Sequence, residues 1–171
     1  ILINTIIAIS QESYLALNQL QENSSSSELT FDKISSKYKF SLDKINSTFI
    51  IKGTSSLHDW EMISKIFDGT IIINKTSDEN LDIKDININV GVKTLISGNK
   101  IMDKKCYKAL RYKEYPNINY QFKSIKEIQL KTDNTYSAVL NGILSIAGKI
   151  KFAKIFVEIV LKGDKISIKG K

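Results

Sequence analysis

The sequence is poor in the residues from which catalytic and metal sites are most often built. Its 171 residues include one cysteine, one histidine, one tryptophan and one proline. A single cysteine, Cys106, excludes an internal disulfide and a zinc site built on a cysteine pair. His58 has no second set of metal ligands around it in the sequence, and no G-x-S-x-G nucleophile motif occurs. We therefore predict no catalytic residue, no metal and no resident cofactor, and we interpret the chain as a non-enzymatic protein.

Two residues keep an enzymatic or redox-associated alternative open. His58 precedes Asp59, but neighbours on a strand point to opposite faces, so a structural or pocket-rim histidine is the favoured interpretation. Cys106 has neighbouring lysines that could lower the pKa of its thiol, yet the sequence cannot place His58 beside it. A structural barrel without a ligand is the third alternative.

Long apolar runs are also absent, since none reaches the roughly 20 residues that a membrane-spanning helix requires. Residues 1–10, ILINTIIAIS, form a shorter run, which we interpret as a signal-peptide remnant with a cleavage site after Ser10. A buried strand or helix of the fold is the alternative. Residues 11–36 are polar and serine-rich, which is typical of a linker. This organisation predicts a periplasmic or secreted protein whose domain spans residues 37–171.

Within residues 37–171 the hydrophobic pattern is almost entirely of the strand type. Ile86, Ile88 and Val90 alternate with polar residues, as on a strand with one apolar face. Seven or more strands joined by short turns predict an antiparallel meander, and exposed edges favour its closure into a barrel. The predicted strands are Tyr38–Leu42, Phe49–Ile51, Ile63–Asn74 with a bulge or bend at Gly69, Leu81–Leu95, Asn117–Leu130, Tyr136–Ile146, Val157–Leu161 and Ile166–Ile168, with a hairpin turn at Asp133–Asn134.

One short amphipathic helix interrupts this pattern. Met102, Cys106 and Leu110 recur every four residues after Lys100, and Pro116 is expected to end the helix. Its outer face is basic, in a chain with 25 Lys and Arg against 18 Asp and Glu and a formal charge of +7. A solvated surface is one interpretation, and a rim that attracts an anionic head group or a membrane surface is the other. Nucleic acid is disfavoured, because exposed aromatics are not interleaved with the basic residues. The predicted rim comprises Lys104, Lys105, Lys108 and Arg111.

Several short motifs together resemble the lipid/polyisoprenoid-binding YceI-like family, over about Tyr38 to Lys171. A strand ends in a Ser-Gly turn, a helix opens with Met-Asp and ends with Lys-Ala-Leu, and a Tyr-Pro-x-Ile strand follows. A Gly-x-Leu-x-Ile-x-Gly strand comes later. The motifs are Ser97–Gly98, Met102–Asp103, Lys108–Ala109–Leu110, Tyr115–Pro116–Asn117–Ile118 and Gly142–Ile143–Leu144–Ser145–Ile146–Ala147–Gly148.

This resemblance implies a lipocalin-like antiparallel β-barrel whose apolar tunnel holds an isoprenoid or another long-chain lipid. It also implies a periplasmic or secreted location and no established catalytic residues. Family members continue past the position of Lys171 with a closing strand, so we expect a barrel without its last strand, with edges at the first and seventh strands. A barrel of about eight strands encloses just enough space for side chains or one slender ligand.

The predicted binding residues are the apolar side chains that alternation places on the inward face, with three helix residues packed over one end. A register error of one residue would invert this assignment. Trp60 is interpreted as a core anchor rather than a stacking platform. The set is Phe49, Ile51, Trp60, Ile71, Ile73, Ile86, Ile88, Val90, Met102, Cys106, Leu110, Tyr120, Phe122, Leu140, Leu144 and Ile146.

Overall fold

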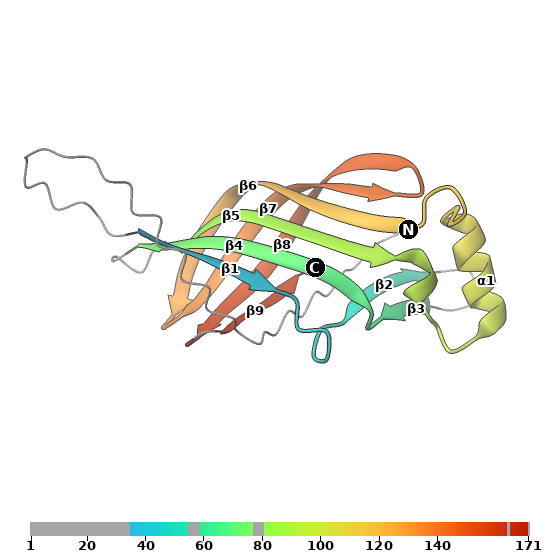
Figure 1. The fold of residues 1–171 in the computed structure, drawn as a ribbon, viewed down its shortest axis with the longest axis horizontal. Coiled ribbons are helices and arrows are strands. Elements are labelled where there is room, and N and C mark those ends of the chain that lie inside the picture. Colours follow the sequence, from blue (N-terminus) through green and yellow to red (C-terminus); the bar gives the residue numbers. More distant parts are fainter. Residues whose placement is uncertain (1–34, 55–58, 77–80, 164, 171) are drawn as a thin grey trace, which may run out of the picture.

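The computed structural model describes residues 35–54, 59–76, 81–163 and 165–170 (Figure 1). These residues form nine strands, one α-helix and one short 3-10 turn. In order, they are β1 (Ser35–Ser41), β2 (Phe49–Thr54), β3 (Asp59–Ser64), β4 (Phe67–Thr76), β5 (Leu81–Gly91), η1 (Val92–Thr94), α1 (Lys100–Ala109), β6 (Asn117–Thr132), β7 (Thr135–Ile146), β8 (Lys149–Lys162) and β9 (Lys165–Gly170). The predictions for residues 1–10, and most of the predicted linker, lie outside the described residues.

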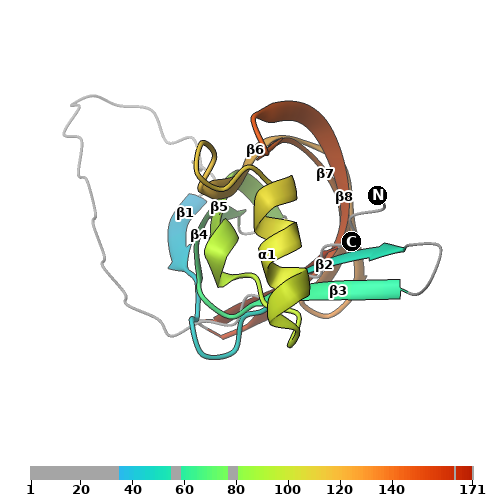
Figure 2. The same ribbon diagram turned by 90° about the vertical axis from the view of Figure 1, so that its right-hand side faces the viewer.

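Seven of the strands form one antiparallel sheet in the order β1-β4-β5-β6-β7-β8-β9, and β2 and β3 form a separate hairpin. From β4 to β9 the sheet is a meander, in which each strand pairs with the next one in the sequence. β1 pairs directly with β4, because β2 and β3 form their own hairpin outside the sheet. The strands curl into a half-barrel, and α1 lies across one end of it (Figures 1 and 2). The fold is therefore all-β, antiparallel and barrel-like, as predicted.

The sheet remains open between β1 and β9. Within the described residues these two strands are its edges, and they do not pair with each other. The expectation of an open edge at the first strand is confirmed, whereas the other edge is β9, the eighth of the predicted strands, rather than the seventh. Each edge presents backbone N–H and C=O groups that a further strand could pair with.

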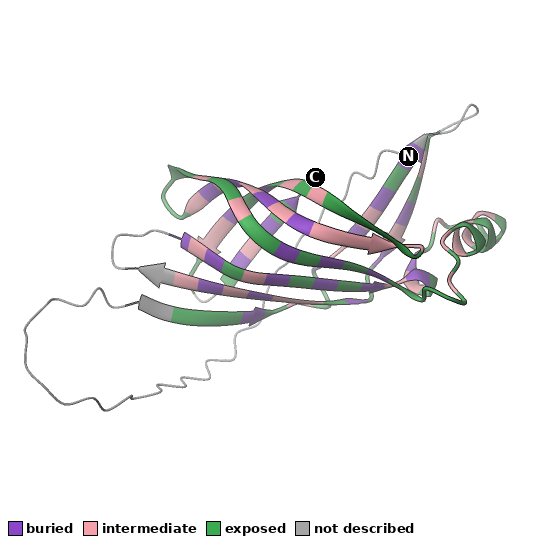
Figure 3. Cartoon of the chain, turned by 90° about the horizontal axis from the view of Figure 1, so that it is seen from above, coloured by how far each residue is buried: buried purple, intermediate pink, exposed green. Residues whose placement is uncertain are grey.

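The core lies on the concave face of the sheet, where alternate residues of each strand point inward. The buried and exposed residues alternate along β5 and the first half of β6 (Figure 3). Cross-strand pairs such as Ile71 with Ile86 and Ile88 with Tyr120 pack side by side on this face. Burying one such side chain contributes about 1.5–3 kcal/mol to the stability of the folded state, so the hydrophobic effect stabilises the curved sheet. One face of the β2–β3 hairpin, with Phe49, Ile51 and Met62, adds to the same core.

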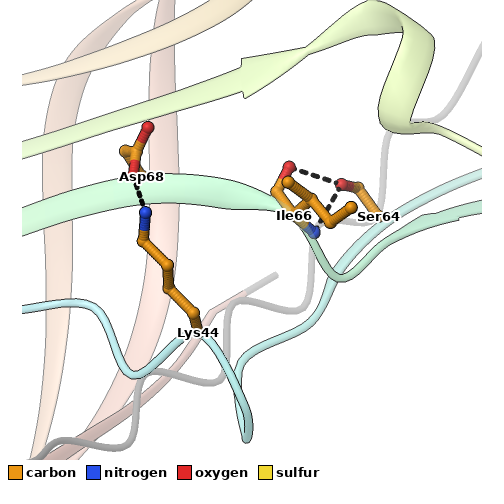
Figure 4. A network of polar contacts seen from close by, with 4 residues as sticks. All are labelled: Lys44, Ser64, Ile66 and Asp68. Carbon is orange, nitrogen blue, oxygen red and sulfur yellow. Dashed lines mark hydrogen bonds and ion pairs between the residues drawn. The ribbon is translucent and has the colours of Figure 1, made fainter.

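The predicted strand from Ile63 to Asn74 is two strands, so that prediction was wrong. β3 ends at Ser64, whose hydroxyl donates to the Ile66 carbonyl at 2.9 Å and accepts from the Ile66 N–H at 3.2 Å (Figure 4). This local bonding closes a tight turn before β4 begins. The irregularity in β4 lies between Ile72 and Ile73 rather than at Gly69. Figure 4 also shows Lys44 paired with Asp68 at 2.8 Å, which ties the β1–β2 connection to β4.

The helix ends earlier than expected, and Pro116 does not end it. α1 stops at Ala109, and Arg111 takes a left-handed conformation with φ 53°. The Arg111 N–H bonds to the Lys108 carbonyl at 3.0 Å and the Tyr112 N–H to the Tyr107 carbonyl at 3.1 Å. These two bonds form a Schellman motif, which usually has glycine at the left-handed position. Because this position holds an arginine instead of a glycine, the sequence did not indicate where the helix ends.

The eighth strand begins at Lys149, well before the predicted start at Val157. The added segment, Lys149–Phe156, carries both lysines and apolar residues on each of its faces, so its pattern does not look like that of a half-buried strand. This segment proves to be part of the candidate site described next.

Candidate functional site: an apolar interior with a basic mouth

The structure brings the sixteen predicted binding residues together in one hydrophobic cluster. Trp60, Met102, Cys106, Leu110, Leu144 and Ile146 are half-buried and pack against that cluster. The other ten are buried: Phe49, Ile51, Ile71, Ile73, Ile86, Ile88, Val90, Tyr120, Phe122 and Leu140. The inward face was therefore assigned in the correct register, and the role of these residues in binding stays a prediction.

One row of paired residues crosses the inner face of the sheet. Ile88 on β5 lies opposite Tyr120 on β6, Tyr120 opposite Leu144 on β7, and Leu144 opposite Lys151 on β8. Because directly opposed residues project from the same face of an antiparallel sheet, Lys151 stands on the same face as the apolar residues of the row. The row of apolar residues on the inner face therefore ends at the cation of Lys151.

The inner face becomes accessible toward the turn between β7 and β8. Along β7, Leu140 is buried whereas Leu144 and Ile146 are only half-buried. Along β8, Val157 is buried whereas Ile155 is only half-buried. Apolar inward-facing side chains are thus exposed in part at this end, where a bound hydrocarbon could cover them.

The same end carries α1. In the β7–β8 turn Ala147 and Gly148 have φ of 52° and 76°, as a tight two-residue hairpin turn requires. A Cβ on Gly148 would collide with the ring of Tyr115, which follows α1. The Arg111 guanidinium lies 4.9 Å from the centre of that ring. The turn and the helix end are therefore in contact, and Figure 2 shows α1 across this end of the sheet.

We call the cations around this opening the basic mouth. From α1 and its C-terminal turn it takes the four predicted rim residues, all of them exposed. From β8 it takes Lys149, which is opposite Ile146, and Lys151. Its members are Lys104, Lys105, Lys108, Arg111, Lys149 and Lys151.

Hydrogen bonds hold α1 in place over the opening. The side chain of Asn99 caps the helix by accepting from the N–H of Ile101 at 2.9 Å and of Met102 at 3.2 Å. The Asp103 carboxylate accepts from the N–H and hydroxyl of Ser97, at 2.8 and 2.6 Å. The Tyr107 hydroxyl donates to the Leu95 carbonyl at 2.8 Å. The apolar side of the helix is thereby fixed toward the core and its lysines toward solvent.

Tyr120 places a polar atom inside the apolar interior. Its hydroxyl is buried without a hydrogen-bond partner among the described residues, and burial raises the pKa of the phenol to about 12. The ring lies against Gly142, where a Cβ would collide with it. Glycine at that position leaves room for the ring. The hydroxyl is therefore available to a polar group of a ligand, at the net cost of an unmade hydrogen bond in its absence.

The two residues of the enzymatic alternative differ in how far the structure describes them. Cys106 is half-buried, and burial followed by the nearby Asp103 charge raises the pKa of its thiol. A protonated thiol is a poor nucleophile, which argues against a reactive Cys106. His58 lies outside the described residues. Among the residues that the structure describes, no three His, Cys, Asp or Glu side chains cluster as they would around a metal ion.

Lys149 and Lys151 are site residues that the sequence analysis missed. They alternate in step with Ala153, Ile155 and Val157, so a strand extended back to Lys149 would have placed them on the inner face. The prediction began this strand at Val157, where regular alternation is obvious, and so lost the two cations.

The fold and this site define the class of protein: an antiparallel, lipocalin-like half-barrel with an apolar inner face. No family model matches the chain, and no curated protein matches it. Among solved structures it is similar to BcnA of Burkholderia cenocepacia, with a TM-score of 0.50 and 14% sequence identity. The match covers 72% of this chain and 92% of BcnA, so it supports the fold across most of both proteins. No helix in the described part of the chain has the length and apolar character to cross a bilayer.

Proposed function

We propose that this protein binds an isoprenoid or another long-chain lipid on the inner face of its half-barrel, and carries or sequesters it without catalysis. The observation that carries the proposal is the gradient along β7 and β8, from buried Leu140 and Val157 to half-buried Leu144 and Ile155. A continuous apolar face that is partly exposed at one end fits a flexible hydrocarbon chain.

The energetics suit a ligand without many polar groups. Each buried methylene contributes about 0.8 kcal/mol, so about 15 of them supply about 12 kcal/mol before the cost of immobilising the chain. The Tyr120 hydroxyl offers one hydrogen bond within the interior. Selectivity among lipids would therefore depend on the length and thickness of the hydrocarbon chain.

The basic mouth favours a lipid with an anionic head group, such as a phosphate or a carboxylate. Lys149 and Lys151 stand on the inner face beside half-buried Leu144 and Ile146, so a head group there would lie near cations while the chain extends inward. α1, which carries the other cations of the basic mouth, lies across the same end of the half-barrel (Figure 2). A purely neutral lipid would make no use of this arrangement.

The YceI-like resemblance supports the same function. The motifs that carry it fall in the α1 segment, in β6 and in β7, which are the elements that build the opening. The proposal includes membership of that family and a periplasmic or secreted location in the bacterial envelope. The raised thiol pKa of Cys106 argues against the redox-associated alternative.

A pair of neighbouring substitutions on β7 tests the proposal. Leu144 and Ile143 are both half-buried, but Leu144 faces inward and Ile143 lies opposite the exposed Phe152 on the outer face. The wild-type protein, purified from bacterial cells and extracted with organic solvent, is expected to release a prenyl lipid or fatty chain detectable by mass spectrometry. Leu144→Glu should lose most of that lipid, because a carboxylate on the inner face would replace an apolar contact with the ligand, and Ile143→Glu should keep it.

Circular dichroism would show that both variants keep their strand content. Repeated recovery of lipid-free wild-type protein, or equal lipid in the two variants, would refute binding at the inner face.

A further inference from the structure

The outer face of β8 carries an exposed apolar patch that the inner-face site does not use. Ile150, Phe152 and Phe156 are 73%, 79% and 65% exposed. They alternate with the inward-facing residues of β8, so all three project from the convex side of the sheet. On β7, half-buried Ile143 and Val139 lie opposite the two phenylalanines. We call these five residues the outer patch.

Such a patch is unusual on a surface that meets only water. Phenylalanine side chains are among the largest apolar groups, and soluble monomers rarely gather several exposed ones on a contiguous surface. Within the described residues β8 pairs with β9 only from Val157 to Lys162, so the segment that carries the patch, Lys149–Phe156, has a free backbone edge. Strand pairing at that edge would use backbone groups and would leave the side chains of the outer patch uncovered, so an external apolar partner is the simplest use for them.

The charge around the patch identifies the kind of partner. Lys154 projects from the same face between Phe152 and Phe156, and Lys149 and Lys151 lie at the end of the same strand. Glu158 follows Phe156 on this face. Residues 100–115 and 147–158 together hold nine of the 25 basic residues and three of the 18 acidic ones, so these two segments account for six of the formal surplus of +7.

The two segments meet in space. The β7–β8 turn contacts Tyr115 at the end of α1, so the basic mouth and the outer patch belong to the same end of the half-barrel (Figures 1 and 2). Aromatic and aliphatic side chains among lysines are typical of surfaces that insert into the interface of an anionic bilayer.

We propose that the outer patch and the adjoining cations form a docking surface for an anionic lipid bilayer. Phe152, Phe156 and Ile150 enter the head-group region, Lys154 on the same face contacts lipid phosphates, and the basic mouth lies at the same end of the half-barrel. A second copy of this chain is a poorer partner, because a two-fold interface on this surface would bring lysines of both copies together. In such a docked state the opening of the inner face lies close to the bilayer. The use of that position for lipid loading rests on the proposed function, whereas docking does not.

Flotation with lipid vesicles tests the proposal with the full chain. The wild-type protein should float with vesicles of equal parts phosphatidylglycerol and phosphatidylcholine, and much less with phosphatidylcholine alone. The double variant Phe152→Ser/Phe156→Ser should bind the anionic vesicles at least about tenfold more weakly, because two large apolar groups no longer enter the interface. Lys154→Glu should weaken binding as well, and added salt should weaken that of the wild type.

A matched control removes two other exposed apolar side chains. Ile45 and Ile66 are 87% and 71% exposed and lie in the β1–β2 connection and the β3–β4 turn. Ile45→Ser/Ile66→Ser should bind vesicles like the wild type. Equal binding by the Phe152→Ser/Phe156→Ser variant, or equal flotation of the wild type with both vesicle types, would overturn the proposal. A wild-type dimer in solution that the phenylalanine variant converts to a monomer would also overturn it, since a second copy would then occupy the patch.

The docking surface and the inner-face site can be separated experimentally. Solvent extraction of the Phe152→Ser/Phe156→Ser variant should still yield any lipid that the wild type carries. A lipid-free wild type that floats with anionic vesicles would support docking and refute the carrier function. A lipid-loaded wild type that does not float would refute docking alone.

Discussion

At the scale of single residues, Tyr120 carries a hydroxyl that lowers the stability of the ligand-free protein and that a ligand could bind. A phenol without a partner in an apolar interior costs free energy, and a glycine at position 142 is needed to accommodate its ring. A phenylalanine would fill nearly the same volume without that cost. A tyrosine here is reasonable if a ligand supplies the missing hydrogen bond.

The substitution Tyr120→Phe should therefore stabilise the lipid-free protein by about 1 kcal/mol, since an unsatisfied buried hydroxyl is removed. It should also change the response to alkaline pH. The ordinary phenol pKa is 10.0 and the folded value is about 12. Below pH 10.0 both states keep the proton and stability is unaffected. Between these two values only the unfolded chain ionises, so stability falls as the pH rises.

Urea unfolding at a series of pH values measures both effects. The wild type should lose more stability than Tyr120→Phe over this interval, and the difference between the two curves isolates this phenol from the lysines and other tyrosines. Parallel curves would contradict a buried, unionised Tyr120.

At the scale of elements, α1 shows how a weak helix is fixed by its ends. It has ten residues and none is fully buried, so packing alone gives it limited support. The Asn99 cap begins it, and the Schellman motif at Arg111 ends it. Between them, Asp103 binds back to Ser97, which fixes the loop before the helix. The position of the basic mouth depends on these end contacts.

Replacement of Asn99 by alanine should destabilise the protein by about 1 kcal/mol, because two helix N–H groups lose their acceptor. Lys104→Ala, on the exposed face of the same helix, is the control and should change stability by less than about 0.5 kcal/mol. Chemical denaturation of both variants measures the difference. An equal effect of the two substitutions would show that the cap does not hold α1.

At the scale of the whole molecule, the half-barrel is a curled sheet whose two edges do not meet in the described residues. Its inner face relies on α1 and the β2–β3 hairpin for part of its cover. A ligand that covers the half-exposed apolar residues would therefore stabilise the folded state as a whole, since it binds that state and not the unfolded chain.

Removal of bound lipid should accordingly lower the melting temperature, and its return should restore it. Saturation at about 100 times the dissociation constant contributes about 2.7 kcal/mol, which corresponds to several degrees for a domain of this size. Differential scanning calorimetry before and after solvent extraction, and after addition of a fatty acid or prenyl phosphate, measures the shift. Leu144→Glu should show little recovery, and a wild type that melts unchanged under all conditions would argue against a ligand on the inner face.

Much of this architecture follows from local patterns in the sequence. Alternation such as that of Ile86, Ile88 and Val90 needs only a two-residue period to assign both strand and face, and the four-residue spacing of Met102, Cys106 and Leu110 assigns the helix and its apolar side. The hydrophobic effect then requires those faces to meet, so antiparallel strands, one helix and an apolar interior were predictable.

Only the tertiary structure decided the features that depend on contacts between distant segments. The turn at Ser64 and Ile66 and the left-handed Arg111 have no distinctive local period, and the strand from Lys149 to Phe156 has apolar residues and lysines on both faces. Each of these features is decided by the backbone groups and strands that lie next to it. The pairing of β8 with β7 turns Lys149 and Lys151 toward the opening and Phe152 and Phe156 toward solvent. Composition revealed a basic chain, but pairing between strands decided where its charge and its exposed aromatic residues gather.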